Sequence, residues 1–168
     1  MPSDAEITFA DHAARLYARR YGMPPMAGRL LGYLMVCDPP EQTIAELAES
    51  LLASRSAIAG AVKVLDSTFC MIRRSRAAGE RMDRVQVDLT SIGAMGFDVT
   101  EYQEQRELAR EGLELLEDAP PERRAVLLEY AAFMDYLVGR LPELKKDWMA
   151  HREALRAAGE LPGAEPSP

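Results

Sequence analysis

The stretch TIAELAESLLASRSAIAGAVKVL, from Thr43 to Leu65, predicts two short helices joined by a tight connection. In the first helix, apolar residues recur at the i, i+3, i+4, i+7 spacing of a half-buried helix, at Ile44, Leu47, Ala48 and Leu51. Thr43 and Glu46 have the spacing of a capping box, in which each side chain covers a backbone amide of the other residue. The first helix therefore begins directly after Thr43.

The second helix is expected to begin after Ser54, a favoured N-cap residue. Its apolar side chains predict one buried face, formed by Ile58, Ala61, Val62 and Leu65. The opposite face is small, cationic and hydroxyl-bearing, and we expect it to contact DNA; its residues are Ser54, Arg55, Ser56, Ala59, Gly60 and Lys63. A short helix supporting such a second helix is typical of a helix-turn-helix. Two amphipathic helices in succession are also common in other helical domains.

The sequence that follows favours a winged helix-turn-helix. A basic segment at 70–76, CMIRRSR, leads through a turn-like AAGE to RVQVDLT at 84–90, where apolar and polar residues alternate as in a half-buried strand. Two strands joined by a basic turn form the wing of such a domain. The candidate DNA contacts in the wing are Arg74, Arg76, Arg81 and Arg84. For Arg84 a structural role, pairing locally to fix the hairpin, is the alternative.

Charge is distributed in agreement with this interpretation. The chain of 168 residues has a formal net charge of −7, which by itself disfavours nucleic-acid binding. Residues 54–84, however, carry seven basic and three acidic side chains, whereas residues 1–53 and 85–168 have net charges of −3 and −8. Positive charge is thus concentrated in the segments that would contact DNA.

The remaining sequence predicts helices on both sides of the winged domain. We expect an N-terminal dimerisation helix within 1–22, with Phe9, Ala13, Leu16, Tyr17 and Tyr21 on one face. The winged domain occupies 23–90, and in it Gly28 and Gly32 allow close helix approach. A helical dimerisation region follows at 97–158, with a kink or restart at Pro142. The Pro/Gly-rich tail at 159–168 is expected to be disordered. The predicted fold class is mainly α with a small β-hairpin wing.

Signals for catalysis, metals and membranes are weak. Asp147 and His151 are four residues apart but fall short of a metal site, and no nucleotide-binding or hydrolase motif occurs. Cys37 and Cys70 are expected to be reduced core residues, which with the absence of a signal sequence predicts a cytoplasmic protein. No apolar run approaches the roughly 18 residues of a membrane helix. We therefore predict no enzyme activity, no cofactor, no metal and no membrane partner.

The segment GMPPMAGRLLGYLMVCDPPEQTIAELAESLLASRSAIAGAVKVL resembles the GbsR-like branch of the MarR-type winged-helix transcriptional regulators. The similarity covers Gly22 to about Val87 and is most specific from Gly28 to Ser56. It implies a dimeric bacterial DNA-binding protein. In it the helix that begins at Ser54 enters the major groove, and the hairpin at 73–84 reaches adjacent backbone or the minor groove. The chain departs from the family pattern at 68–71 (TFCM) and in its short wing, AAGERMD.

We therefore expect a homodimeric, sequence-specific transcriptional regulator whose partners are double-stranded DNA and a second copy of the chain. A protein-interaction module that kept the winged fold is the alternative. A small-molecule effector is left open as a partner, with its site unassigned. Six residues after Phe97 could line an effector pocket, although such side chains more often form core or a dimer seam: Tyr102, Tyr130, Phe133, Met134, Tyr136 and Trp148.

Overall fold

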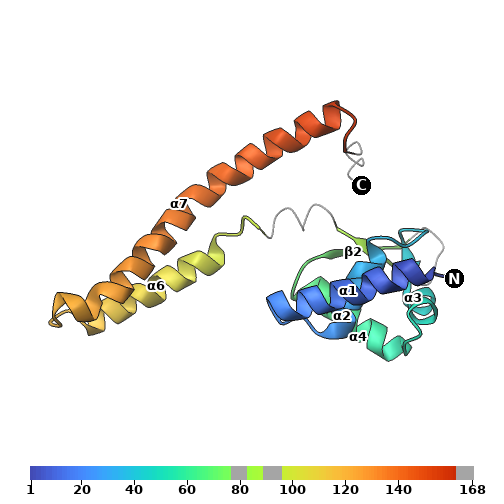
Figure 1. Cartoon of the computed structure of the whole chain (residues 1–168), viewed down its shortest axis with the longest axis horizontal. Coiled ribbons are helices and arrows are strands. Elements are labelled where there is room, and N and C mark those ends of the chain that lie inside the picture. Colours follow the sequence, from blue (N-terminus) through green and yellow to red (C-terminus); the bar gives the residue numbers. More distant parts are fainter. Residues whose placement is uncertain (77–82, 89–95, 162–168) are drawn as a thin grey trace. The chain divides into compact units, whose positions relative to one another are not determined.

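The computed structural model describes residues 1–76, 83–88 and 96–161, and they divide into two compact units, Met1–Gly93 and Ala94–Pro168. Among the described residues, the first unit contains four helices and three short strands, and the second contains two helices. Figure 1 shows the chain with these helices labelled. The prediction of a mainly helical fold with a small β-hairpin wing is confirmed. None of the described helices combines the length and apolar composition that crossing a bilayer requires.

Helix α1 (Asp4–Tyr21) packs on α2 (Pro25–Leu34) at close range. A Cβ atom added to Gly32 would lie 2.4 Å from the Cβ of Ala13, and one added to Gly28 would lie 3.0 Å from the Cα of Ala14. The two glycines therefore permit the close approach that their spacing predicts. The predicted apolar face of α1 is only partly correct, because small residues make this contact. Three of its five members are exposed: Phe9, Leu16 and Tyr21.

The helix-turn-helix consists of α3 (Ile44–Ser50) and α4 (Arg55–Ser67). The predicted capping box is present, since Thr43 Oγ1 accepts from the Glu46 amide at 3.3 Å and Glu46 Oε2 accepts from the Thr43 amide at 2.7 Å. The buried side of α4 contributes Ile58, Val62 and Leu65 to a core shared with α2. The sequence therefore places both helices correctly.

The wing is formed by β2 (Ile72–Ser75) and β3 (Arg84–Val87), which pair antiparallel with Ile72 opposite Val87. A two-residue strand, β1 (Gln42–Thr43), pairs with the other edge of β3, so the strand order is β1-β3-β2. This third strand is absent from the sequence prediction. It joins the start of α3 directly to the wing.

The second unit is a helical hairpin of α6 (Thr100–Leu115) and α7 (Pro121–Ala157). Leu127 of α7 packs where Gly112 of α6 has no side chain, since a Cβ atom added to Gly112 would lie 2.8 Å from Leu127 Cδ1. Helix α7 has 37 residues against 16 in α6, and its C-terminal part extends past α6 (Figure 1).

Helix α7 does not restart at Pro142, because it continues through this residue, which lies inside the helix. The kink that was the other possibility at Pro142 stays a prediction. Proline removes one helical donor, which leaves the carbonyl four residues earlier without its partner. Pro142 is exposed, so water can reach this side of α7. The proline is therefore accommodated within one continuous helix.

The two cysteines have different surroundings. Cys37 is buried in the core as predicted, and burial raises the pKa of its thiol to about 11. Cys70 is exposed, with a φ of 50° between α4 and β2, so its prediction as a core residue is wrong. Of the tail predicted to be disordered, 159–168, residues 162–168 lie outside the described residues.

Candidate nucleic-acid interface

The candidate interface begins at the N-terminus of α4. Ser54 is the N-cap, as predicted, and its Oγ accepts from the Ala57 amide at 3.1 Å. The hydroxyl groups of Ser54 and Ser56 are 3.0 Å apart and hydrogen-bonded to each other. Both side chains are exposed. Ser54 therefore has a structural role in starting the helix, and both hydroxyls lie where amides and the helix dipole favour an anion.

The outer face of α4 is exposed along its length. Its members are the predicted ones: Arg55, Ser56, Ala59, Gly60 and Lys63. A Cβ atom added to Gly60 would meet no atom within 4 Å. Among the described residues, no carboxylate lies within ion-pair distance of Arg55 or Lys63. Two cations are thus presented outward on a helix face with little side-chain bulk.

The predicted wing arginines have partners within the protein. Arg74 Nε lies 3.3 Å from Asp66 Oδ2 at the end of α4. Arg76 Nε donates to Asp83 Oδ1 at 2.7 Å, just beyond the ends of β2 and β3 that the loop connects. Arg76 remains largely exposed, whereas Arg74 is partly covered. Arg81 lies outside the described residues. The wing therefore contributes arginines whose charge is partly balanced by nearby acids.

Arg84 has the structural role that we considered as an alternative, although with different partners from those expected. Its Nη1 lies 3.6 Å from Glu46 Oε2 and donates to the Glu41 backbone carbonyl at 3.4 Å. Ser75 adds a second link, because its Oγ donates to Glu41 Oε2 at 2.9 Å. The wing is thereby connected to the start of α3. Sequence reasoning missed both acids because they lie more than thirty residues away along the chain.

The same carboxylate of Glu46 serves the capping box and the wing. Hydrogen bonds from the Thr43 amide and hydroxyl, together with the nearby Arg84 guanidinium, hold the pKa of Glu46 below its usual value. Ionised Glu46 is thus favoured in the folded state. This charge orients Arg84 and α3 relative to each other.

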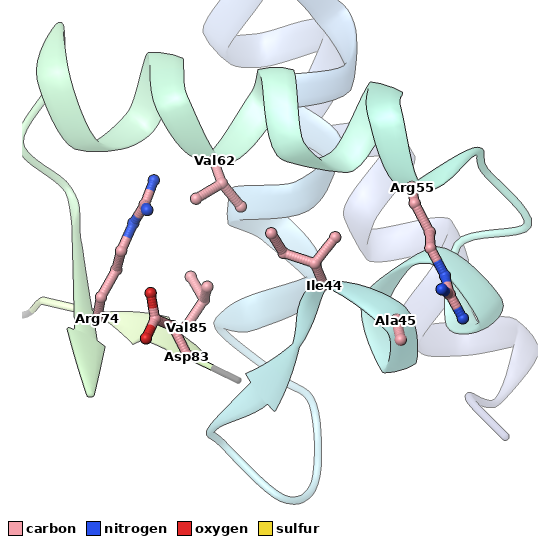
Figure 2. A pocket seen from close by; sticks show the side chains of 7 residues that line it. All are labelled: Ile44, Ala45, Arg55, Val62, Arg74, Asp83 and Val85. Atoms are coloured by element: carbon pink, nitrogen blue, oxygen red, sulfur yellow. The ribbon is translucent and has the colours of Figure 1, made fainter. Parts of the chain in front are cut away.

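A hollow of about 230 Å³ lies between α3, α4 and the sheet. Figure 2 shows Arg55 and Arg74 at opposite ends of it, with the apolar side chains of Ile44, Val62 and Val85 between them. Asp83 lies on the wing side of the hollow (Figure 2). Cations of α4 and of the wing therefore border one concave surface, which the sequence did not predict.

Two kinds of site were considered for the second unit, a metal site and an effector pocket. Among the described residues, no three His, Cys, Asp or Glu side chains come together as metal ligands. The six candidate pocket residues lie in different environments: Met134 is buried, Tyr130 donates to Gln105 Oε1 at 2.6 Å, and Phe133 and Tyr136 are more than half exposed. None of the six lines either of the two hollows described for the chain, and we assign no effector site to them.

Comparison with known proteins agrees with this geometry. A family model described as "MmpR5-like MarR family transcriptional regulator" matches residues 93–162. The "HTH-type transcriptional regulator MmpR5" of Mycobacterium tuberculosis (strain ATCC 25618 / H37Rv) is 34% identical over 122 residues, covering 72% of this chain and 73% of that protein.

A solved structure described as "Crystal Structure of a transcriptional regulator" is 29% identical, with a TM-score of 0.73 over 87% of this chain and 99% of its own. None of these matches names the GbsR-like branch, which stays a prediction. The Mycobacterium tuberculosis relative, at 34% identity over 72% of this chain, establishes the family. The chain belongs to the MarR family of winged-helix, DNA-binding transcriptional regulators, and within that family it is similar to the MmpR5-like group.

Proposed function

We propose that this regulator acts as a homodimer that recognises a specific operator, with α4 as the reading helix in the major groove and the wing on adjacent backbone or in the minor groove. The observation that carries the proposal is the outer face of α4, where Arg55 and Lys63 are exposed and have no acidic partner among the described residues. Because the other side chains of this face are small, these cations can approach both the phosphates and the base edges of a groove.

Apolar side chains left exposed on two helices support the homodimer. Val126, Phe133 and Leu144 of α7 are 76%, 55% and 55% exposed, and their spacings of seven and eleven residues place them on one side of the helix. Phe9 and Leu16 of α1 are also exposed and seven residues apart. Burial of such faces against a second copy would stabilise the pair and present two reading helices to one duplex.

Further aspects of the proposal follow from the family. A regulator of transcription acts where the chromosome is, so we place the protein in the bacterial cytoplasm. Placement in the GbsR-like branch is supported by the segment from Gly28 to Ser56. The family is not an enzyme family, and no catalytic role is proposed.

The DNA-binding part is tested by selecting bound duplexes from a random-sequence pool and titrating the selected duplex with salt. We expect a sequence with two-fold symmetry. Arg55→Ala and Lys63→Ala should each lower the salt slope by about 0.9 for every phosphate that the variant no longer neutralises. Lys146→Ala on α7 is the matched control and should leave the slope unchanged. Failure to enrich any sequence would favour the protein-interaction alternative.

The dimer is tested by light scattering coupled to size exclusion. Phe133→Glu places a charge within the exposed apolar stripe of α7 and should produce monomers. Lys146→Glu introduces the same side chain at another exposed position of α7 and should remain dimeric. A wild-type protein that is monomeric at all accessible concentrations would overturn the homodimer.

A further inference from the structure

Arg29 of α2 connects two separate elements of the winged unit. Its Nε donates to Asp11 Oδ1 of α1 at 2.6 Å, and its Nη1 donates to the backbone carbonyl of Leu51 at 2.8 Å. The Arg29 side chain is three-quarters buried. We call these three residues, Asp11, Arg29 and Leu51, the Arg29 clamp. The clamp joins the N-terminal helix to the end of the first helix of the helix-turn-helix.

Leu51 begins the turn that connects α3 to α4 and so sets the direction of α4. It is the C-cap of α3, and its side chain is fully buried in the core. Leu52 follows with a φ of 50° and a side chain that is 90% exposed. Only Ala53 and the N-cap Ser54 then separate this turn from α4. A shift of the Leu51 carbonyl would therefore change the direction in which the reading helix begins.

The guanidinium group is suited to this task because its donors lie in one rigid plane. Two of its nitrogen atoms reach acceptors on two different elements, and a lysine ammonium is a single point charge that cannot reproduce this fork. Charge-assisted hydrogen bonds of this kind are stronger than neutral ones. The clamp thus resists relative movement of α1 and the turn.

We propose that Arg29 is a positioning residue that couples α1 to the orientation of α4, and so to operator recognition. The inference rests on the proposed function, since it assigns α4 to DNA and α1 to the interface between two copies. Movement of α1 within that interface would reach the reading helix through Asp11, Arg29 and the Leu51 carbonyl. Arg29 itself acts through the turn and contacts no DNA.

The test compares Arg29→Lys with Arg15→Lys, the same change at an exposed position of α1. Arg29→Lys should weaken binding to the selected duplex by about tenfold, the effect of removing one charge-assisted hydrogen bond. Binding to a random duplex and the salt slope should both be unchanged, because the variant still neutralises the same phosphates. Arg15→Lys should bind as the wild type does.

Hydrogen exchange provides a readout that does not require DNA. The amides of Leu52 and Ala53, which donate to the Glu49 and Ala48 carbonyls, should exchange faster in Arg29→Lys. Amides of α6 and α7 should be unaffected. Asp11→Ala keeps the bond to Leu51 and removes the link to α1, and it serves as the second variant if Arg29→Lys unfolds. It should weaken specific binding without accelerating exchange at Leu52.

Two results would overturn the clamp. One is wild-type exchange at Leu52 and Ala53 together with wild-type affinity in Arg29→Lys. The other is an equal weakening of specific and random-duplex binding with a smaller salt slope, which would make Arg29 a direct phosphate contact. If the wild-type protein binds no DNA, the proposed function fails, while the exchange measurement still decides whether Arg29 holds the turn.

Discussion

Asp66, in the last turn of α4, lies within 3.3 Å of the Arg74 guanidinium of β2, so α4 itself holds a wing arginine. Both side chains are more than 40% exposed. An ion pair this exposed contributes little to stability, about 0–1 kcal/mol. Its larger effect is on the Arg74 guanidinium, which the pairing with Asp66 holds beside α4 and partly neutralises.

Asp66→Asn should increase affinity for the selected duplex. The change releases Arg74 for phosphate and removes a negative charge beside the proposed groove contact. We expect a steeper salt slope, by up to about 0.9 for one added phosphate contact. Asp118→Asn, an equal change at an exposed position between α6 and α7, should have no effect. Unchanged affinity on anisotropy titration at low salt would show that Arg74 makes no DNA contact once released.

Gly60→Ala should have opposite effects on stability and on binding. No protein atom lies near the added Cβ, so the helix gains about 0.5–1 kcal/mol of stability from the better propensity of alanine. If the backbone of α4 approaches the groove floor at Gly60, the methyl group should weaken operator binding. Thermal melts and anisotropy titrations measure the two effects.

Gly139→Ala is the matched control, because Gly139 is an exposed helical glycine of α7 with equally open surroundings. This variant should be more stable than the wild type without any change in DNA affinity. Gly60→Ala binding as tightly as the wild type would place the groove contact elsewhere on α4.

Glu46 makes part of the stability dependent on pH. Its pKa in the folded protein lies below the usual value of 4.5, because Thr43 donates two hydrogen bonds to the carboxylate and Arg84 is nearby. A lowered pKa contributes stability that is present above 4.5 and is lost as the pH falls through the folded pKa. Glu46→Gln should therefore destabilise the protein at neutral pH and have a smaller effect at about pH 3.

Urea unfolding at several pH values measures this difference. Glu49→Gln, on the same helix and also exposed, is the control because its carboxylate is outside the capping box. An effect of Glu46→Gln that is equal at neutral and acidic pH would mean that the charge of Glu46 does not stabilise the start of α3.

Local signals account for what could be predicted. The Thr43–Glu46 capping box and the Ser54 N-cap act within three residues, and apolar spacing follows the helical period, so α3 and α4 could be placed correctly from sequence. The missed features depend on distant partners. Strand β1 exists only because β3 lies beside Gln42 and Thr43, and Arg84 is paired with Glu46 rather than with its neighbour Asp83.

The two units also differ in how informative their sequences are. The family resemblance lies in Gly28 to Ser56, a segment in which two glycines permit close packing of α1 on α2 and a capping box starts α3. The segment after Phe97 has only a helical pattern, yet the family model matches residues 93–162. Exposed helix faces tolerate many side chains, so periodicity alone could not identify this segment.

The two thiols should differ sharply in reactivity. Thiolate is the reactive form of cysteine. Burial raises the pKa of Cys37 to about 11, and the folded chain also shields it from reagents, whereas Cys70 is exposed. Iodoacetamide at about pH 8 should modify Cys70 first, and Cys37 should react only when denaturant is added. Intact mass measured over time follows the two steps, and Cys70→Ser should abolish the fast one.

The raised pKa of Cys37 also makes the free energy of unfolding depend on pH in the alkaline range. Its folded pKa lies above the ordinary value of 9.0, so its contribution is complete below that value and is lost as the pH rises through about 11. Cys37→Ala should flatten the decline of stability on this alkaline side, whereas Cys70→Ser should not. Equal alkylation rates for both thiols in the folded wild type would contradict the buried position of Cys37, and with it the packing of the α2 end against the core.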